Sequence, residues 1–172
     1  MISPRYARDI ISGYKDAGGK VPIDLHSHYT SGMTGLSYWA ACEAGVDILD
    51  TAMSPISGGT GGAPTESVVA ALQGTKYDTG YDLEKLIEIR KYFNEIWHKN
   101  RHIIRQESMK VDPSVMVHQI PGGMLSNLVS QLEMQGASDK YYQVLDETAK
   151  VREELGYPPL VTPTSQGVGV QA

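Results

Sequence analysis

The sequence predicts an α/β protein in which short parallel strands alternate with helices. Two runs have the alternating or apolar character of strands, 21–28 (VPIDLHSH) and 46–52 (VDILDTA). Helical patterns that begin at Ser3-Pro4 and at Leu36 precede the two strands. The order helix, strand, helix, strand requires crossover connections, so the two strands are expected to be parallel.

A glycine-rich loop and a third helix follow the second strand. The loop 57–63 (SGGTGGA) lacks the Gly-Lys-Ser/Thr sequence of a phosphate-binding loop, so it is interpreted as a tight backbone path. Pro64-Thr65 then opens a predicted helix, TESVVAALQG.

The second half of the chain is predicted to be mostly helical. A long amphipathic helix over 83–97 is followed by a brief extended stretch, 115–119, and by helices that stop at Gly136 and Gly156. The predicted buried stripe of the long helix comprises Leu86, Ile89, Phe93 and Ile96.

Composition restricts the class of protein. The chain has 172 residues and a net charge of −5, which argues against a nucleic-acid surface. No apolar run reaches the ~18 residues of a membrane helix, and the first residues lack the apolar core of a signal peptide. The single cysteine, Cys42, excludes an internal disulfide and fits a reducing compartment. We therefore expect a cytoplasmic protein with no membrane span and no nucleic-acid partner.

The first predicted strand carries the main candidate site. Alternation along the strand places Asp24, His26 and His28 on one face, at the strand's C-terminal end. Two imidazoles on one strand face can hold a divalent metal ion, and in alternating strand–helix barrels the active site lies at that end. The alternative is a pair of polar residues that line the mouth of a barrel. A second pair, His98 and His102, lacks the glutamate of the His-Glu-x-x-His pattern.

Four segments together resemble the carboxyltransferase domain of biotin-dependent enzymes. That family includes pyruvate carboxylase, the oxaloacetate decarboxylase alpha subunit and the pyruvate-binding subunit of transcarboxylase. The segments are LHSHYTSG (25–32), AGVDILDTA (44–52), QIPGGMLSNL (119–128) and PLVTPTSQGVGVQA (159–172).

The resemblance implies the C-terminal part of a TIM (β/α)8 barrel, namely its last two strands, followed by a mostly helical extension. Residues 1–75 would hold the last strands and helices of the barrel, and residues 76–172 the extension that packs on it. The strand with His26 and His28 would be the seventh of the barrel, and the strand 46–52 the eighth.

The resemblance also implies a biotin-dependent carboxyltransferase, or oxaloacetate decarboxylase-type enzyme, that moves a carboxyl group between carboxybiotin and pyruvate or oxaloacetate. His26 and His28 would be ligands of a divalent metal (Zn, Mn or Co) that polarises the keto acid and stabilises the enolate. Thr162 would pass a proton between biotin and the enol of pyruvate, and Ser165 would lie near the biotin pocket. A hydroxyl suits such a relay because it both donates and accepts.

Part of that active site has no counterpart in this sequence. The family's other metal ligands are an aspartate on the first strand and a carbamylated lysine on the sixth, and Lys15 and Lys20 are at the wrong positions to replace the lysine. This chain alone is therefore expected to be incomplete and inactive. Its expected partners are the remaining barrel segment or a complementary chain, and a biotinyl carrier domain or subunit. The complete enzyme is expected to be a homo-oligomer.

Two alternatives stay open. The chain could be a catalytically inactive truncated fragment, because two strands cannot close a barrel and unpaired edges invite another chain. It could also belong to a metal-dependent aldol-type lyase barrel, since such barrels share a His-x-His on a late strand. The VTPTSQ and PGGMLSN segments favour carboxyl transfer.

The position of Thr162 is a further prediction. LVTPTS is apolar and rich in hydroxyls, so the tail is not expected to trail freely in solvent. Pro163 restricts Thr162 to extended conformations. We expect Thr162 to lie near the mouth of the histidine strand; the alternative is a threonine that caps the terminal helix.

Overall fold

The computed structural model of the chain describes residues 2–104, 106–118, 120, 122–161 and 163–172. The chain divides into two compact units, Met1–Val111 and Asp112–Ala172. This division concerns contacts within the chain. The expected boundary between barrel and extension at residues 75 and 76 stays a prediction.

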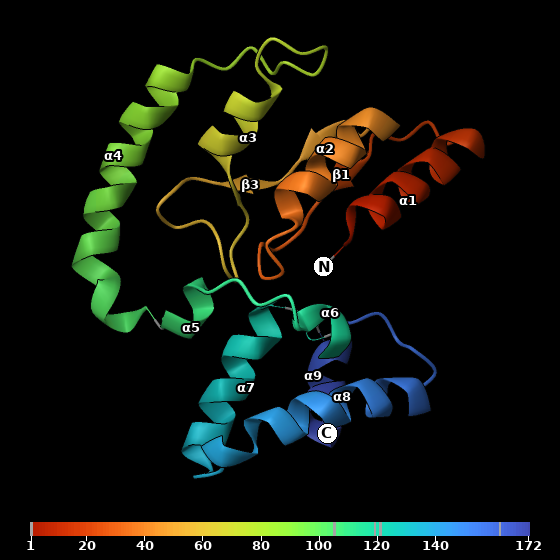
Figure 1. Cartoon of the computed structure of the whole chain (residues 1–172), viewed down its shortest axis with the longest axis vertical. Helices are drawn as coiled ribbons and strands as arrows, with labels where there is room; N and C mark the ends of the chain where they lie inside the picture. Colours follow the sequence, from red (N-terminus) through yellow and green to blue (C-terminus); the bar gives the residue numbers. More distant parts are fainter. Residues whose placement is uncertain (1, 105, 119, 121, 162) are drawn as a thin grey trace. The chain divides into compact units, whose positions relative to one another are not determined.

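The first unit begins with the predicted order of helix, strand, helix and strand. Helix α1 (Pro4–Asp16) is capped by the Ser3 hydroxyl, which accepts from the Tyr6 backbone N–H at 3.2 Å. Strand β1 (Asp24–Leu25) and strand β2 (Ile48–Leu49) flank helix α2 (Thr34–Ala44). Helices α1 and α2 lie side by side (Figure 1). Strands β1 and β2 are parallel, which confirms the predicted α/β class.

The second predicted strand, 46–52, forms two short strands, each of which pairs with a different neighbour. After β2, the chain continues through Asp50 into β3 (Thr51–Ala52), which pairs in parallel with β4 (Ala63–Pro64). Helix α3 (Thr65–Leu72) follows β4 directly. The sequence predicted a loop where β4 begins. The strand forms there because the end of the glycine-rich loop returns beside β3.

The first predicted strand is shorter than expected. The sequence indicated 21–28, whereas β1 pairs with β2 only at Asp24 and Leu25. Beyond β1, the backbone turns towards the glycine-rich loop, where the Tyr29 N–H donates to the Gly61 carbonyl at 2.7 Å. His26 and His28 therefore follow the strand instead of lying in it.

A buried tyrosine joins the ends of β1 and β2. Tyr38 on α2 is only 1% exposed, and its hydroxyl lies 2.5 Å from the Asp50 carbonyl and 3.4 Å from the Ser27 carbonyl. Ser27 follows β1 and Asp50 follows β2. One phenol therefore holds both chain segments that leave the parallel pair.

We expect Tyr38→Phe to lower the free energy of unfolding by about 1–2 kcal/mol, because it leaves a buried carbonyl without its donor. Burial raises the pKa of Tyr38 from 10.0 to about 12, and the carboxylates of Asp50 and Asp24 add to the effect. A phenol that binds its proton more tightly in the folded state stabilises the fold below pH 10.0 and loses this contribution as the pH rises to about 12.

Denaturant titrations of the wild type and Tyr38→Phe between neutral pH and pH ~12 check this expectation. The stability difference between the two proteins should narrow as Tyr38 ionises. The matched control is Tyr81→Phe, because Tyr81 is 65% exposed. A constant difference over the whole range would contradict the account.

The long helix α4 (Leu83–Asn100) is present as predicted, but its predicted buried stripe is wrong. None of the residues of α4, all of which the structure describes, is buried, and Ile89 is 47% exposed. The Asp82 carboxylate caps the helix by accepting from the Glu84 N–H at 3.0 Å. Amphipathic spacing identifies the apolar face of a helix but not the element that covers it. The unit ends with a 3₁₀ turn, η1 (Arg101–Ile103), and the short helix α5 (Gln106–Met109).

The second unit is helical. Its elements are α6 (Val115–His118), α7 (Gly122–Met134), the 3₁₀ turn η2 (Ser138–Lys140), α8 (Tyr141–Glu154) and α9 (Thr164–Gln171). Helices α7 and α8 supply most of the core, and α9 packs on both of them. The core cluster comprises Ile120, Met124, Leu125, Leu128, Leu132 and Leu145.

The prediction of an extended stretch at 115–119 is wrong over its described part. Residues 115–118 form α6 because Asp112 begins a helical turn. Its carboxylate accepts from the Ser114 N–H at 2.9 Å and from the Ser114 hydroxyl at 2.6 Å. The Met116 N–H then donates to the Pro113 carbonyl at 3.0 Å. The capping aspartate thus outweighs the β-branched residues Val115 and Val117.

Candidate functional site

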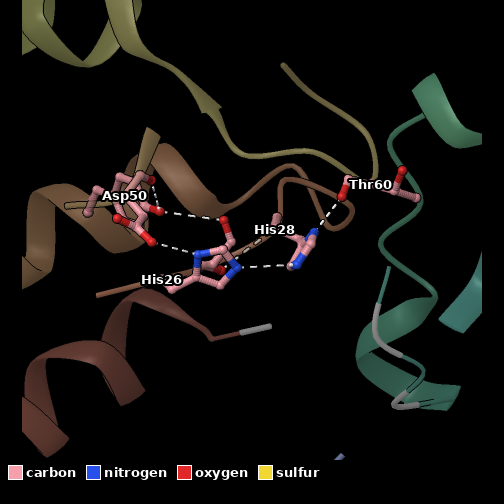
Figure 2. A network of polar contacts seen from close by, with 6 residues as sticks. His26, His28, Asp50 and Thr60 are labelled. Atoms are coloured by element: carbon pink, nitrogen blue, oxygen red, sulfur yellow. Dashed lines mark hydrogen bonds and ion pairs between the residues drawn. The ribbon is translucent and has the colours of Figure 1, made fainter. Parts of the chain in front are cut away.

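The two predicted histidines converge at the end of β1. Their Nε2 atoms are 3.3 Å apart, and the rings meet edge to face with centroids separated by 5.1 Å (Figure 2). The sequence predicts that His26 and His28 point to the same side of one strand; their side chains do lie together, but outside β1. Both residues lie just after the strand, in the segment that leads into the loop before α2.

Asp50 provides the partner of the first histidine. Its carboxylate Oδ2 lies 2.9 Å from the His26 Nδ1, as Figure 2 shows. Asp50 stands between β2 and β3, so the parallel pairing of β1 with β2 brings it beside His26. The sequence pattern predicts a strand at Asp50 and indicates no role for its side chain. The available signal was a second carboxylate, after Asp47, in the predicted strand 46–52 (VDILDTA).

The glycine-rich loop provides the partner of the second histidine. The His28 Nδ1 donates to the backbone carbonyl of Thr60 (Figure 2). The Thr60 N–H in turn donates to the Ser108 carbonyl at 2.8 Å. Gly59 has a φ of +49°, and a Cβ there would collide with the Ser108 backbone. This close approach agrees with the interpretation of the loop as a tight backbone path.

A buried carboxylate holds the start of the same loop. Glu66 at the beginning of α3 is 8% exposed, and its two oxygens accept from the Ser54 N–H at 3.2 Å and the Ser54 hydroxyl at 2.8 Å. The Arg90 Nε of α4 donates to the same hydroxyl at 3.1 Å. The segment from Ser54 to β4 is therefore fixed at its beginning as well as at Thr60.

The histidine pair fits part of a divalent metal site. Two imidazole nitrogens bound at about 2.0–2.1 Å to one tetrahedral zinc ion lie about 3.3–3.4 Å apart. The Nε2 atoms of His26 and His28 have that separation, 3.3 Å. Within the described residues, no group of three or more His, Cys, Asp or Glu side chains is arranged to hold a metal ion. The pair can therefore supply two metal ligands. The Lys15 amino group does not add a third, because it contacts the Asp47 carboxylate at 3.1 Å.

We expect the chain by itself to bind zinc or manganese only weakly, because two imidazoles leave at least two coordination positions to water. Calorimetry on the 172-residue chain measures this affinity. The matched control is His26→Ala. A sub-micromolar dissociation constant that is lost in His26→Ala would show that further ligands lie within the chain.

The two predicted residues of the tail belong to the second unit. Thr162 lies outside the described residues, so its role and its expected place near His28 stay predictions. Ser165 lies in α9, is 4% exposed, and donates its backbone N–H to the Val161 carbonyl at 2.9 Å. Its expected place near a biotin pocket also stays a prediction.

Two known families match successive parts of the chain. Residues 1–92 match the family described as HMGL-like, and residues 115–172 match the one described as conserved carboxylase domain. The chain therefore belongs to the HMGL-like family. More narrowly, it resembles the carboxyltransferase domain of biotin-dependent enzymes, as the four sequence segments predicted.

Two curated relatives illustrate this resemblance. A pyruvate carboxylase subunit of Methanothermobacter thermautotrophicus is 56% identical over 172 residues, which are 100% of this chain and 30% of the relative. The methylmalonyl-CoA carboxyltransferase 5S subunit of Propionibacterium freudenreichii subsp. shermanii is 49% identical and is covered over 34% of its length. The chain thus spans about a third of the length of each of these two relatives.

Solved structures agree with the sequence comparison. The carboxyl transferase domain of Rhizobium etli pyruvate carboxylase matches 98% of this chain with a TM-score of 0.87 and 31% identity, over 28% of its own length. The same domain solved with pyruvate and biocytin also gives a TM-score of 0.87.

In the part of the chain that the structure describes, no helix combines the length and apolarity needed to cross a membrane.

Proposed function

We propose that this chain forms part of a biotin-dependent carboxyltransferase that moves a carboxyl group between carboxybiotin and pyruvate or oxaloacetate. The observation that carries the proposal is the convergence of the His26 and His28 Nε2 atoms to 3.3 Å. It occurs in a chain whose full length matches carboxyltransferases. A similar domain has been solved with pyruvate and biocytin, the two kinds of ligand that such a reaction brings together.

His26 and His28 would hold the divalent metal (Zn, Mn or Co) through their Nε2 atoms. Once bound, the metal would polarise the keto acid and stabilise its enolate. The protein's own contribution is to fix the two rings. The Asp50 carboxylate contacts His26, the Thr60 carbonyl accepts from His28, and Tyr38 holds the segments that carry His26 and Asp50.

Thr162 and Ser165 are proposed to act on the side of biotin. The Thr162 hydroxyl would accept a proton from one reactant and donate one to the other, which requires hydrogen-bond reach of about 2.6–3.2 Å or one bridging water. Ser165 would line the biotin pocket. The biotin itself would be carried by a separate domain or subunit.

The proposed setting is the end of a TIM barrel. In this interpretation β1 is the seventh barrel strand, the segment with β2 and β3 is the eighth, and residues 76–172 form the extension. Parallel pairing of β1 with β2 supports the assignment. The remaining strands would come from another segment or a complementary chain, and the complete enzyme would be a homo-oligomer in the cytoplasm.

The aldol-type lyase is the competing enzyme class. The conserved carboxylase match over residues 115–172 favours carboxyl transfer, because it covers the PGGMLSN and VTPTSQ segments that pointed to that reaction. The inactive-fragment alternative predicts no transfer even when the missing part of the domain is supplied.

A chimera separates these possibilities. In it, this chain replaces the matching 172-residue segment of the Methanothermobacter thermautotrophicus protein, which is 56% identical. The proposal predicts that the chimera binds metal and transfers carboxyl groups between carboxybiotin and pyruvate. Circular dichroism and metal analysis show whether it is folded and loaded. A folded, metal-loaded chimera without transfer activity would contradict the proposed function.

A further inference from the structure

We propose that Asp50 is a positioning residue that, together with the Thr60 carbonyl, fixes both histidines in the tautomer with a bare Nε2. The inference deepens the proposed function, because its consequence for metal binding rests on that function. The assignment of the tautomers depends only on four groups of the first unit and on no bound ligand. These groups are the two imidazoles, the Asp50 carboxylate and the Thr60 carbonyl (Figure 2).

The tautomers follow from what each partner can do. An ionised carboxylate and a backbone carbonyl only accept hydrogen bonds. The 2.9 Å contact between Asp50 Oδ2 and His26 therefore requires a proton on Nδ1 of that ring. The contact of the Thr60 carbonyl with His28 requires the same. In a neutral imidazole with Nδ1 protonated, Nε2 carries the lone pair.

Two bare nitrogens therefore face each other at 3.3 Å. Two lone pairs at this distance repel, and a divalent metal ion bound to both nitrogens would relieve the repulsion. The Asp50 carboxylate also lies behind the first ring, 2.9 Å from its Nδ1, where a hydrogen-bonded carboxylate orients a ligating imidazole. The arrangement thus favours a divalent cation at the two Nε2 atoms before any other ligand arrives.

The backbone of Asp50 is fixed on both sides. Its N–H donates to the Leu25 carbonyl at 3.1 Å, and its carbonyl accepts from the Tyr38 hydroxyl at 2.5 Å. The carboxylate is therefore presented to His26 by a segment that β1 and α2 both hold. This anchoring distinguishes Asp50 from a surface carboxylate that meets a histidine by chance, even though its side chain is 51% exposed.

Nitrogen NMR of the full chain, labelled at histidine and free of metal at mildly alkaline pH, tests the tautomers directly. Wild-type His26 and His28 are expected to show a protonated Nδ1 and a bare Nε2. In Asp50→Asn, the side-chain amide can donate to Nδ1, so His26 should shift towards the Nε2-protonated tautomer while His28 stays unchanged. Asp50→Glu, which keeps a carboxylate, should restore part of the wild-type tautomer.

Zinc titration followed by the same histidine signals tests the consequence. Asp50→Asn is expected to weaken zinc binding about 10–100-fold, the usual effect of removing a partner behind a metal ligand. Asp16→Asn, which removes the same charge from an exposed position on α1, is the matched control and should bind zinc like the wild type.

Several results would overturn the inference. One is the finding that wild-type His26 carries its proton on Nε2. This measurement does not depend on whether Asp50→Asn folds. Others are an unchanged His26 tautomer and zinc affinity in a folded Asp50→Asn, or zinc binding that is weakened equally in Asp16→Asn. The tautomer measurement uses neither metal nor substrate. An inactive chimera would therefore count against the proposed function and leave the role of Asp50 intact.

Discussion

His28→Ala in the chimera is expected to lower the rate of carboxyl transfer by about 10³-fold or more and to reduce the bound metal. The variant removes one of the two Nε2 atoms that meet at 3.3 Å. A metal that stabilises an enolate contributes several kcal/mol to the transition state, and each 1.36 kcal/mol corresponds to about tenfold in rate. The measurements are the transfer rate from carboxybiotin to pyruvate and the metal content of the purified protein.

His98→Ala is the matched control for that experiment. His98 is an exposed imidazole on α4, outside the histidine pair, and its removal should leave both metal content and rate unchanged. Full metal content and full activity in His28→Ala would remove the pair from the mechanism. Equal losses in the two variants would point to a general effect on the fold.

Thr162→Ala in the chimera is also expected to slow carboxyl transfer strongly. If Thr162 passes a proton between biotin and the enol of pyruvate, its loss should slow carboxyl transfer in the chimera by about 10²–10⁴-fold, the usual contribution of a positioned proton-transfer group. The metal content should stay intact, because a relay hydroxyl is not a metal ligand in this account. The measurements are again the rate and the metal content.

Thr162→Ser is the control that separates chemistry from structure, because serine keeps the hydroxyl. We expect it to retain much of the activity that Thr162→Ala loses. An unaltered transfer rate in Thr162→Ala would exclude a catalytic role. Parallel loss of metal and activity would instead indicate that Thr162 supports the fold.

The parts of the fold that depend on local signals could be predicted from the sequence. Ser3 caps α1 as its position before Pro4 indicated, and Gly45, with a φ of +90°, ends α2. The parallel pairing of β1 with β2 followed from the order of the elements. Alternation in the HSH motif placed His26 and His28 on one side, and the structure has them together.

The partners of the histidines could not be predicted in the same way. Asp50 is 24 residues from His26, and Thr60 is 32 residues from His28. Such contacts are set by strand register and loop path, which no local pattern encodes. Thr60 moreover acts through its carbonyl, which every residue has. Its identity in the sequence therefore carries no signal.

Two of the wrong predictions have different physical causes. At 115–118, the sequence predicts an extended stretch, but the Asp112 cap begins a helix. At α4, the apolar spacing was interpreted as a buried stripe, whereas Ile89 is 47% exposed. The first error arose because the capping signal of Asp112, which is local, was not taken into account. The second required knowledge of the neighbouring element, which spacing alone does not contain.

The central claim is that His26 and His28 hold a divalent metal through Nε2 in a carboxyltransferase. Anomalous X-ray diffraction from crystals of the zinc-loaded chimera, collected at the zinc edge, tests it most directly. The account predicts one strong peak bonded to the Nε2 atoms of both histidines, with the Asp50 carboxylate on the Nδ1 of His26 behind it. A peak at another site, or a metal bonded through Nδ1, would contradict the account.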